Sequence, residues 1–198
     1  MNTDAIKNID FTSPAVLIGA VVVLLLIAVA IAVAVDLKKK KTARLRSRFG
    51  AEYDLALSET GSRKKAEEAL RSRVSRIEKL KFRDLPVAER EHFLSAWGTV
   101  QSRFVDNPRK AVIEADELVN SLLVARGYPV GEFEQRAADI SVSHSTLVEP
   151  YRLAHAITAR SERNEATTEE LRTAMIQYRT LFDALLETDT TIDHRKLA

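Results

Sequence analysis

The chain has 198 residues, with 30 Lys and Arg against 28 Asp and Glu, and it contains no cysteine. The lack of cysteine excludes a disulfide scaffold, a thiolate zinc site and a cysteine nucleophile. Six glycines and five prolines are too few for a collagen-like or low-complexity chain. The net charge of +2 conceals an asymmetry, because residues 36–83 hold 16 basic and 7 acidic residues whereas residues 84–198 hold 13 basic and 19 acidic ones.

The first element is a continuous apolar segment, residues 15–35, made almost entirely of Ala, Val, Leu and Ile. A helix of 21 residues is about 31 Å long, which matches the hydrocarbon thickness of a bilayer. Ser13 suits a helix cap and Pro14 a first helical position. These features predict a transmembrane helix over residues 15–35.

A basic segment follows at once and predicts the orientation of this helix. Basic residues that flank a span stay on the cytoplasmic side, so we expect residues 1–14 outside and the C-terminal part in the cytoplasm. Basic side chains near a bilayer are also attracted to anionic lipid headgroups. The residues predicted to contact the membrane surface are Lys38, Lys39, Lys40, Lys41, Arg44, Arg46 and Arg48.

The alternative is a signal peptide that is cleaved near Ala34, which would give an exported protein. Ala28-Val29-Ala30 and Ala32-Val33-Ala34 have the small-residue spacing of cleavage sites. A signal peptide, however, has a basic start and an apolar stretch of about 7–15 residues. Here the first 14 residues hold one Lys and two Asp, and the apolar stretch is longer. The sequence therefore favours an uncleaved anchor.

Residues 36–61 are predicted to form a basic juxtamembrane helix or linker, with breaks at Gly50 and at Thr60-Gly61-Ser62. Apolar residues at helical spacing then predict an all-α bundle of five to six helices over residues 62–187. The helices expected are Ser62 to about Arg83, Pro86 to Asp106, Pro108 to Arg126, Glu132 to Ile140, Ser145 to Arg163 and a last helix after Thr167. Residues 188–198 have no pattern and are expected to be disordered.

Several helix ends have specific signals. Asn107 is expected to cap the helix that Pro108 begins, and Gly127 to end it in a left-handed conformation. Thr167 and Glu170 form a capping box before the last helix. Pro150 either marks the true start of its helix or kinks it. The aromatic residues expected in the core are Phe93, Trp97, Phe104, Tyr178 and Phe182.

The histidines offer little chemistry. Glu89 and His92 form a single Glu-x-x-His pair, whereas di-iron bundles need two such pairs, so we predict a surface pair and no metal site. His155 is expected to be a partly buried structural histidine, and His144 to lie near a helix start. Without a glycine loop for phosphate or a serine nucleophile elbow, the sequence predicts no catalytic residues and no cofactor. An enzyme with a dispersed site at His155, Glu149 and Asp139 is the alternative.

The helix expected over residues 62–83 holds nine basic and three acidic residues. We expect these charges to be solvated. There are two alternatives. The helix could lie along the membrane, or its basic residues could pair with the acidic residues further along the chain. The sequence has neither a groove-reading element nor interleaved stacking aromatic residues, so we expect no nucleic-acid partner.

Several short motifs resemble a bacterial family. They are Arg48-Phe49-Gly50-Ala51-Glu52-Tyr53-Asp54, Trp97, Gln101 to Asp106, Arg126-Gly127-Tyr128-Pro129 and Phe133 to Ala137. Members of that family are single-pass, helical and uncharacterised, and are sometimes labelled membrane or secreted proteins. The resemblance covers about residues 45–187 and implies a layout without implying an activity. Together with the anchor, it favours a membrane-tethered, non-enzymatic interaction module of the inner membrane that binds another protein or itself.

Overall fold

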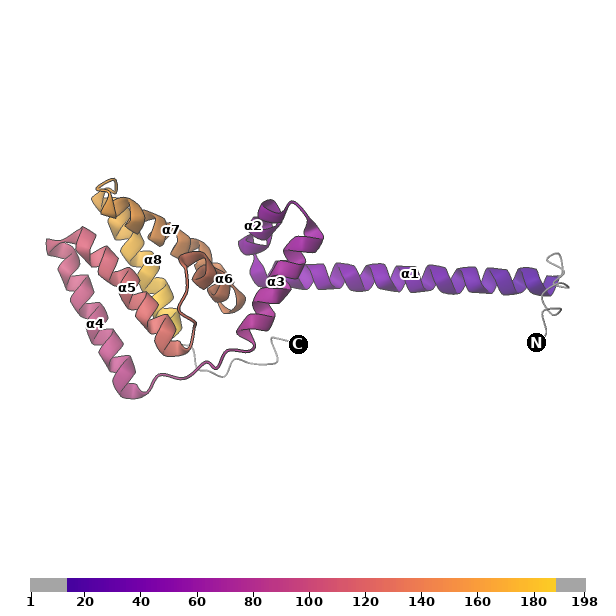
Figure 1. Cartoon of the computed structure of the whole chain (residues 1–198), viewed down its shortest axis with the longest axis horizontal. Helices are drawn as coiled ribbons and strands as arrows, with labels where there is room; N and C mark the ends of the chain where they lie inside the picture. The colour runs from indigo at the N-terminus through magenta and orange to yellow at the C-terminus, as the bar shows by residue number, and fades with distance from the viewer. Residues whose placement is uncertain (1–13, 188–198) are drawn as a thin grey trace. The chain divides into compact units, whose positions relative to one another are not determined.

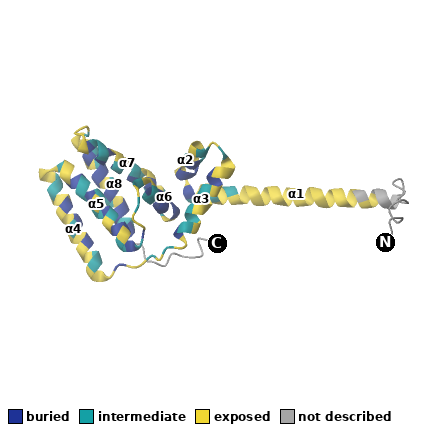
Figure 2. Ribbon diagram, in the orientation of Figure 1, coloured by how far each residue is buried: buried dark blue, intermediate teal, exposed yellow. Residues whose placement is uncertain are grey.

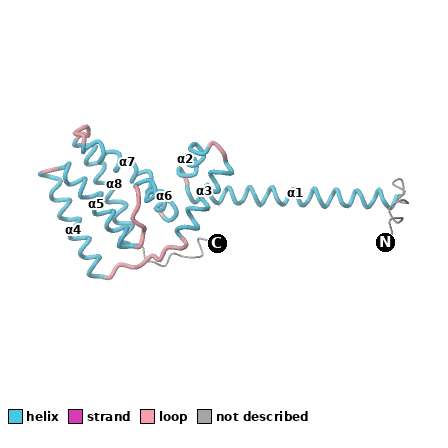
Figure 3. Tube along the Cα trace, viewed as in Figure 1, coloured by secondary structure: helices cyan, strands magenta, loops and turns pink. Residues whose placement is uncertain are grey.

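The structure is a computed structural model that describes residues 14–187, apart from the side chains of residues 14–17 and 20. These residues form eight helices and no strand (Figure 1, Figure 3). The helices are α1 (Pro14–Phe49), α2 (Ala51–Thr60), α3 (Arg63–Ile77), α4 (Val87–Asp106), α5 (Pro108–Arg126), α6 (Phe133–Ser143), α7 (Ser145–Glu162) and α8 (Thr168–Glu187). The prediction of an all-α chain, with one long apolar helix before a helical domain, is confirmed. The extreme N-terminus and the C-terminal tail, for which we expected an outside location and disorder, lie outside the described residues.

The chain divides into two compact units, Met1–Leu45 and Arg46–Ala198. The described part of the first unit is a single helix, most of α1, and its described side chains are exposed from residue 18 to residue 41 (Figure 2). The described Val, Leu and Ile side chains from Ile18 to Leu37 are 45–65% exposed. Among the described residues one helix is long and apolar enough to cross a membrane, and the candidate segment is Val21–Phe49.

The second unit contains the hydrophobic core, which is built by α4 to α8. Fully buried small residues of α5, such as Ala111 and Ala115, let neighbouring helices approach closely. The Trp97 ring of α4 lies 4.8 Å from the Phe182 ring of α8, and Tyr151 of α7 packs edge-on to Tyr178. The predicted aromatic core is therefore confirmed, with Phe104 only partly buried at its edge.

The caps predicted at Asn107 and Thr167 are present, whereas Ser13 lies outside the described residues. The Asn107 side chain accepts a hydrogen bond from the Lys110 N–H at 3.1 Å, and Pro108 is the first residue of α5. At the start of α8, the Thr167 N–H donates to the Glu170 carboxylate at 2.8 Å, and the Glu170 N–H donates to the Thr167 hydroxyl at 3.3 Å. These bonds satisfy N–H groups that a helix cannot satisfy internally.

Helix α3 is shorter than expected, because it ends at Ile77 and not near Arg83. The chain beyond it forms a connector that lies against the end of α5. There the Arg83 N–H donates to the Arg126 carbonyl at 3.2 Å, and the Phe82 ring meets Tyr128 edge-on at 4.7 Å. These long-range contacts outweigh the local helical pattern. Pro150, by contrast, lies inside α7, which begins at Ser145, so it does not mark the start of that helix.

Helices α2 and α3 form a hairpin that packs on α6 and α7. The predicted breaks at Gly50 and Gly61 flank α2. The buried apolar residues of this region, which are Phe49, Tyr53, Ala56, Ala66, Leu70 and Ile77, are separate from the cluster formed by α4 to α8. The hairpin thus has a small core of its own and meets the bundle across a boundary rich in charge.

Candidate functional site

The seven basic residues predicted to contact the membrane have different environments. Lys38 to Lys41 and Arg44 are exposed on α1, and Lys40 makes an ion pair with Asp36 one turn earlier, at 2.8 Å. An exposed pair of this kind contributes little to stability. For these five residues, contact with lipid headgroups stays a prediction.

Arg46 and Arg48 have partners within the second unit. The Arg46 guanidinium lies 3.3 Å from the Asp54 carboxylate and over the Tyr53 ring. Arg48 is half-buried and donates through Nε to the Val142 carbonyl at 3.4 Å. These contacts give both residues a structural role at the base of the domain.

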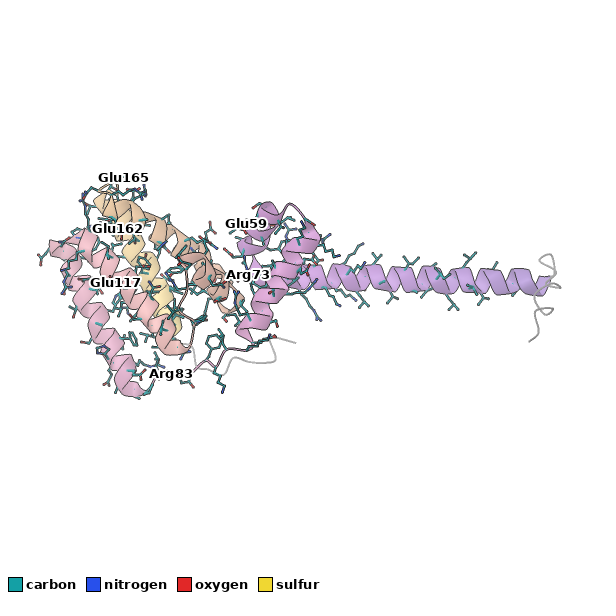
Figure 4. All side chains as sticks on the ribbon, viewed as in Figure 1. Glu59, Arg73, Arg83, Glu117, Glu162 and Glu165 are labelled. Atoms are coloured by element: carbon teal, nitrogen blue, oxygen red, sulfur yellow. The ribbon has the colours of Figure 1, made fainter. Side chains whose placement is uncertain are left out.

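Buried carboxylates and arginines join the α2–α3 hairpin to α6 and α7. One of these arginines, Arg73 on α3, is labelled in Figure 4. Glu52 of α2 is buried and lies 3.3 Å from Arg73 of α3 and 3.2 Å from Arg152 of α7. Arg152 also pairs with Glu134 of α6. Burial lowers the pKa of Arg152, but the hydrogen bonds that Arg152 donates to the Glu134 and Glu52 carboxylates raise it by more, so the guanidinium stays protonated.

A second junction lies beside the first. The Asp139 carboxylate of α6 is fully buried and accepts hydrogen bonds from Arg76 Nε at 3.0 Å and from the Gln135 amide at 3.0 Å. The expectation that the basic residues of 62–83 are all solvated is therefore wrong for Arg73 and Arg76. An arginine fork fits a buried carboxylate better than a lysine does, and in this helix Lys64 and Lys65 are exposed.

His155 lies in a polar cluster between α5, α6 and α7. Its ring stacks on Phe133 at 3.7 Å, and its Nδ1 lies 3.7 Å from Asp116 Oδ1. The Asp116 carboxylate accepts from Asn120, whose own carbonyl accepts from the Tyr151 hydroxyl. The side chain is one-third exposed, which agrees with a partly buried structural histidine.

The residues of the dispersed-site alternative have different neighbours. Asp139 is held by Arg76 and Gln135, His155 lies against Asp116 and Phe133, and Glu149 is exposed. No described contact joins any two of the three. Glu89 pairs with Arg83 at 2.7 Å, and within residues 14–187 no group of three or more His, Asp or Glu is arranged to hold a metal ion.

A groove between α4 and α8 is the feature that the sequence did not reveal. It encloses about 560 Å³. Both helices pack against α5, and the Trp97 and Phe182 rings meet between them. Its lining includes Trp97, Phe104, Met175, Ile176, Arg172 and Arg179. Sequence periodicity assigns the first three to the core, but it cannot show that the edge of that core is open.

Comparison with known protein families, with curated proteins and with solved structures found no match. The resemblance to a bacterial family of single-pass helical proteins therefore stays a prediction.

Proposed function

We propose that this chain is a single-pass protein of the bacterial inner membrane that tethers a cytosolic helical domain, and that this domain is a non-enzymatic interaction module. In this proposal the N-terminus lies outside, and α2 to α8 lie in the cytoplasm. The partner is another protein or a second copy of the chain, with the bilayer and its anionic headgroups as the surroundings.

The observation that carries the proposal is the exposed apolar surface of α1. Its described Val, Leu and Ile side chains from Ile18 to Leu37 are exposed, and about 25 cal/mol is lost for each Å² of apolar surface left in water. A bilayer removes this cost, and the helical backbone satisfies its own hydrogen bonds in lipid. The exposed Lys38 to Lys41 directly after the apolar residues favour the cytoplasmic side for the domain.

The chemistry of the domain supports a binding role over a catalytic one. Its most buried carboxylates, Glu52 and Asp139, are neutralised by arginines that connect one helix to another. Such pairs position helices. A tether, in turn, confines the domain to the membrane surface and raises its effective concentration for partners held there.

Membrane extraction tests the anchor. Sodium carbonate removes peripheral proteins, so the full chain should stay in the membrane pellet, and replacement of Val22, Leu25 and Val29 by Asp should release it. Recovery of the unaltered chain in the soluble fraction, beginning near residue 35, would support the signal-peptide alternative and reject the anchor.

Affinity purification after cross-linking in cells tests the interaction module. The full chain is compared with a control that retains only residues 1–61. We expect a protein partner, or the chain itself, to be recovered with the full chain and not with the control. Equal recovery with both would show that the helical domain contributes nothing to binding, which contradicts the proposal.

A further inference from the structure

We propose that the groove between α4 and α8 binds an amphipathic helical segment of a partner protein, with bulky apolar residues on one face and carboxylates beside them. The inference deepens the proposed function, on which it rests, by naming the binding face and the chemistry of the partner. It depends on the shape of the groove, its apolar floor and its charge.

The groove has the dimensions of a short helix face. Trp97, Gln101 and Phe104 line it from α4, and Arg172, Met175, Ile176, Arg179 and Thr180 line it from α8. Each set covers about two helical turns, which corresponds to roughly 10–12 Å. Two parallel walls of this length accommodate two turns of a third helix, with anchors at positions i and i+3 or i+4.

The floor of the groove and part of its rim are apolar. Trp97 and Met175 are mostly buried, whereas the Ile176 side chain on the rim is 57% exposed. Ile176 lies outside the buried stripe of α8, so its side chain is not part of the hydrophobic core. A partner that covers it with an apolar side chain gains about 1.5–3 kcal/mol for each such residue that becomes fully buried.

The charge of the groove selects the partner. Residues 84–198 hold 13 basic and 19 acidic residues, yet the charged residues among the described groove lining are both arginines, Arg172 and Arg179. Each arginine is also paired with a carboxylate of α8 outside the lining, Arg172 with Glu169 and Arg179 with Asp183. The charged groups of the lining itself are thus guanidinium groups, which favour a segment that carries carboxylates over a basic one.

The two arginines are suited to bind carboxylates. Arg179 is fixed, because its Nε donates to Asp183 at 2.7 Å and its guanidinium lies over the Trp97 and Phe182 rings at 5.4 and 5.7 Å. No described contact uses its two terminal nitrogens. Arg172 makes an exposed ion pair with Glu169 at 3.2 Å. Breaking such a pair, so that Arg172 can bind a carboxylate of the partner instead, costs at most about 1 kcal/mol.

Selection from a library tests the inference. The full chain in nanodiscs is presented with a phage-displayed library of random 16-residue peptides. We expect the selected peptides to combine Leu, Ile, Met or Phe at helical spacing with Asp or Glu. Synthetic copies should change the emission of Trp97, which is the one tryptophan in the chain, on binding.

Matched variants locate the site. Ile176→Glu should weaken the selected peptides at least about tenfold, because it removes an apolar contact and places a carboxylate against an acidic peptide, and Arg172→Glu should weaken them about threefold to tenfold. Val130→Glu and Arg163→Glu are the controls and should change binding less than twofold. Val130 is 84% exposed but outside the groove, and Arg163 has the same 59% side-chain exposure as Arg172 and a similar ion pair, with Glu165. All four positions are exposed, so folding should be retained, which circular dichroism checks.

Several outcomes would overturn the inference. These are selection without acidic residues, equal weakening by the control variants, or no selected peptide at all. Dimerisation of the full chain that Ile176→Glu abolishes would assign the groove to a second copy. Binding of the groove to anionic vesicles would assign it to lipid, and peptide binding that needs removal of residues 188–198 would assign it to the chain's own tail. If a partner is recovered by affinity purification while selection fails, the interaction module stands and the groove is rejected.

Discussion

At the scale of single residues, the domain depends on positions whose role is set by a contact distant in sequence. Gly127 is the clearest case. It ends α5 at a φ of +100°, and a Cβ added there would lie 2.6 Å from the Lys81 carbonyl oxygen. The connector after α3 passes so close to this residue that a side chain cannot be accommodated. Gly127 is thus needed for two reasons. It ends α5, which the local sequence predicts, and it leaves room for the connector, which the local sequence does not show.

Replacing Gly127 by alanine should destabilise the domain. The left-handed conformation costs an L-residue about 1–2 kcal/mol, and the clash with Lys81 adds to that cost. Gly98 is the matched control, because nothing lies within 4 Å of a Cβ added there and alanine is a better helix former by about 0.5–1 kcal/mol. Urea unfolding of the full chain, followed by Trp97 fluorescence, should show Gly127→Ala shifted to lower urea and Gly98→Ala to higher urea. Equal effects would contradict the close approach of the connector.

His144 should make the stability of the domain sensitive to mild acid. Burial, with a further contribution from the positive charge of Arg126, lowers the pKa of His144 below its ordinary value of 6.5. The unfolded chain therefore takes up a proton near pH 6.5 while the folded chain does not, so stability falls as the pH falls through 6.5. His144→Gln should lose less stability between pH 7.5 and 5.5 than the unsubstituted chain in the same urea experiment. An unchanged pH dependence would show that His144 ionises equally in both states.

At the scale of elements, the helix ends carry much of the specification of the fold. Helix α8 has the largest set of buried side chains, from Leu171 to Leu186, and its start is fixed by the reciprocal bonds of Thr167 and Glu170. Arg160 of α7 adds an ion pair to Glu170 at 2.6 Å. The cap therefore also ties the end of α7 to the start of α8.

Loss of this cap should destabilise the domain measurably. Thr167→Ala removes a hydroxyl that accepts the Glu170 N–H, and loss of such a cap costs about 1 kcal/mol. Thr168→Ala, one residue later and without a described hydrogen bond of its side chain, is the control and should change stability by less than about 0.5 kcal/mol. Thermal unfolding by circular dichroism distinguishes the two, and equal effects would contradict the capping role.

The same cap should also weaken in acid. The Thr167 N–H, then the Arg160 guanidinium, lower the pKa of Glu170 from 4.5 to about 2. The stabilisation from its carboxylate is thus complete above pH 4.5 and is lost as the pH falls towards 2. An NMR titration should find the Glu170 carboxylate ionised at pH 3.5. Protonation of Glu170 near pH 4.5 would show that these hydrogen bonds do not form in solution.

How far the sequence predicts the structure depends on the range of the contacts involved. The apolar stripe of Phe93, Trp97 and Val100 repeats at helical spacing, and the cap at Asn107 is a local motif. Helices and their starts are therefore predictable. The ion pairs of Glu52 connect residues 21 and 100 positions away, and no local pattern encodes them. The groove could not be predicted for the same reason. Periodicity places Trp97 and Met175 inwards but does not show that Ile176 and Arg172 remain on an open rim.

At the scale of the whole molecule, two different boundaries are present. Within the second unit, the α2–α3 hairpin meets α6 and α7 through Glu52, Asp139 and their arginines, and removal of one partner from such a buried pair leaves an unpaired charge that costs about 3–5 kcal/mol. The apolar part of α1, in the first unit, is exposed instead. The charges at the first boundary are paired within the protein, whereas the proposed function assigns the apolar surface of α1 to a bilayer.

The most direct test of the membrane anchor and its orientation uses the lack of cysteine in the chain. Two single-cysteine variants, Thr3→Cys before α1 and Ser72→Cys on the exposed face of α3, are treated in intact spheroplasts with a maleimide that cannot cross membranes. The account predicts that Thr3→Cys is labelled at once and that Ser72→Cys is labelled only after lysis. Labelling of Ser72→Cys in intact spheroplasts would contradict it, because the helical domain would then lie outside the cytoplasm.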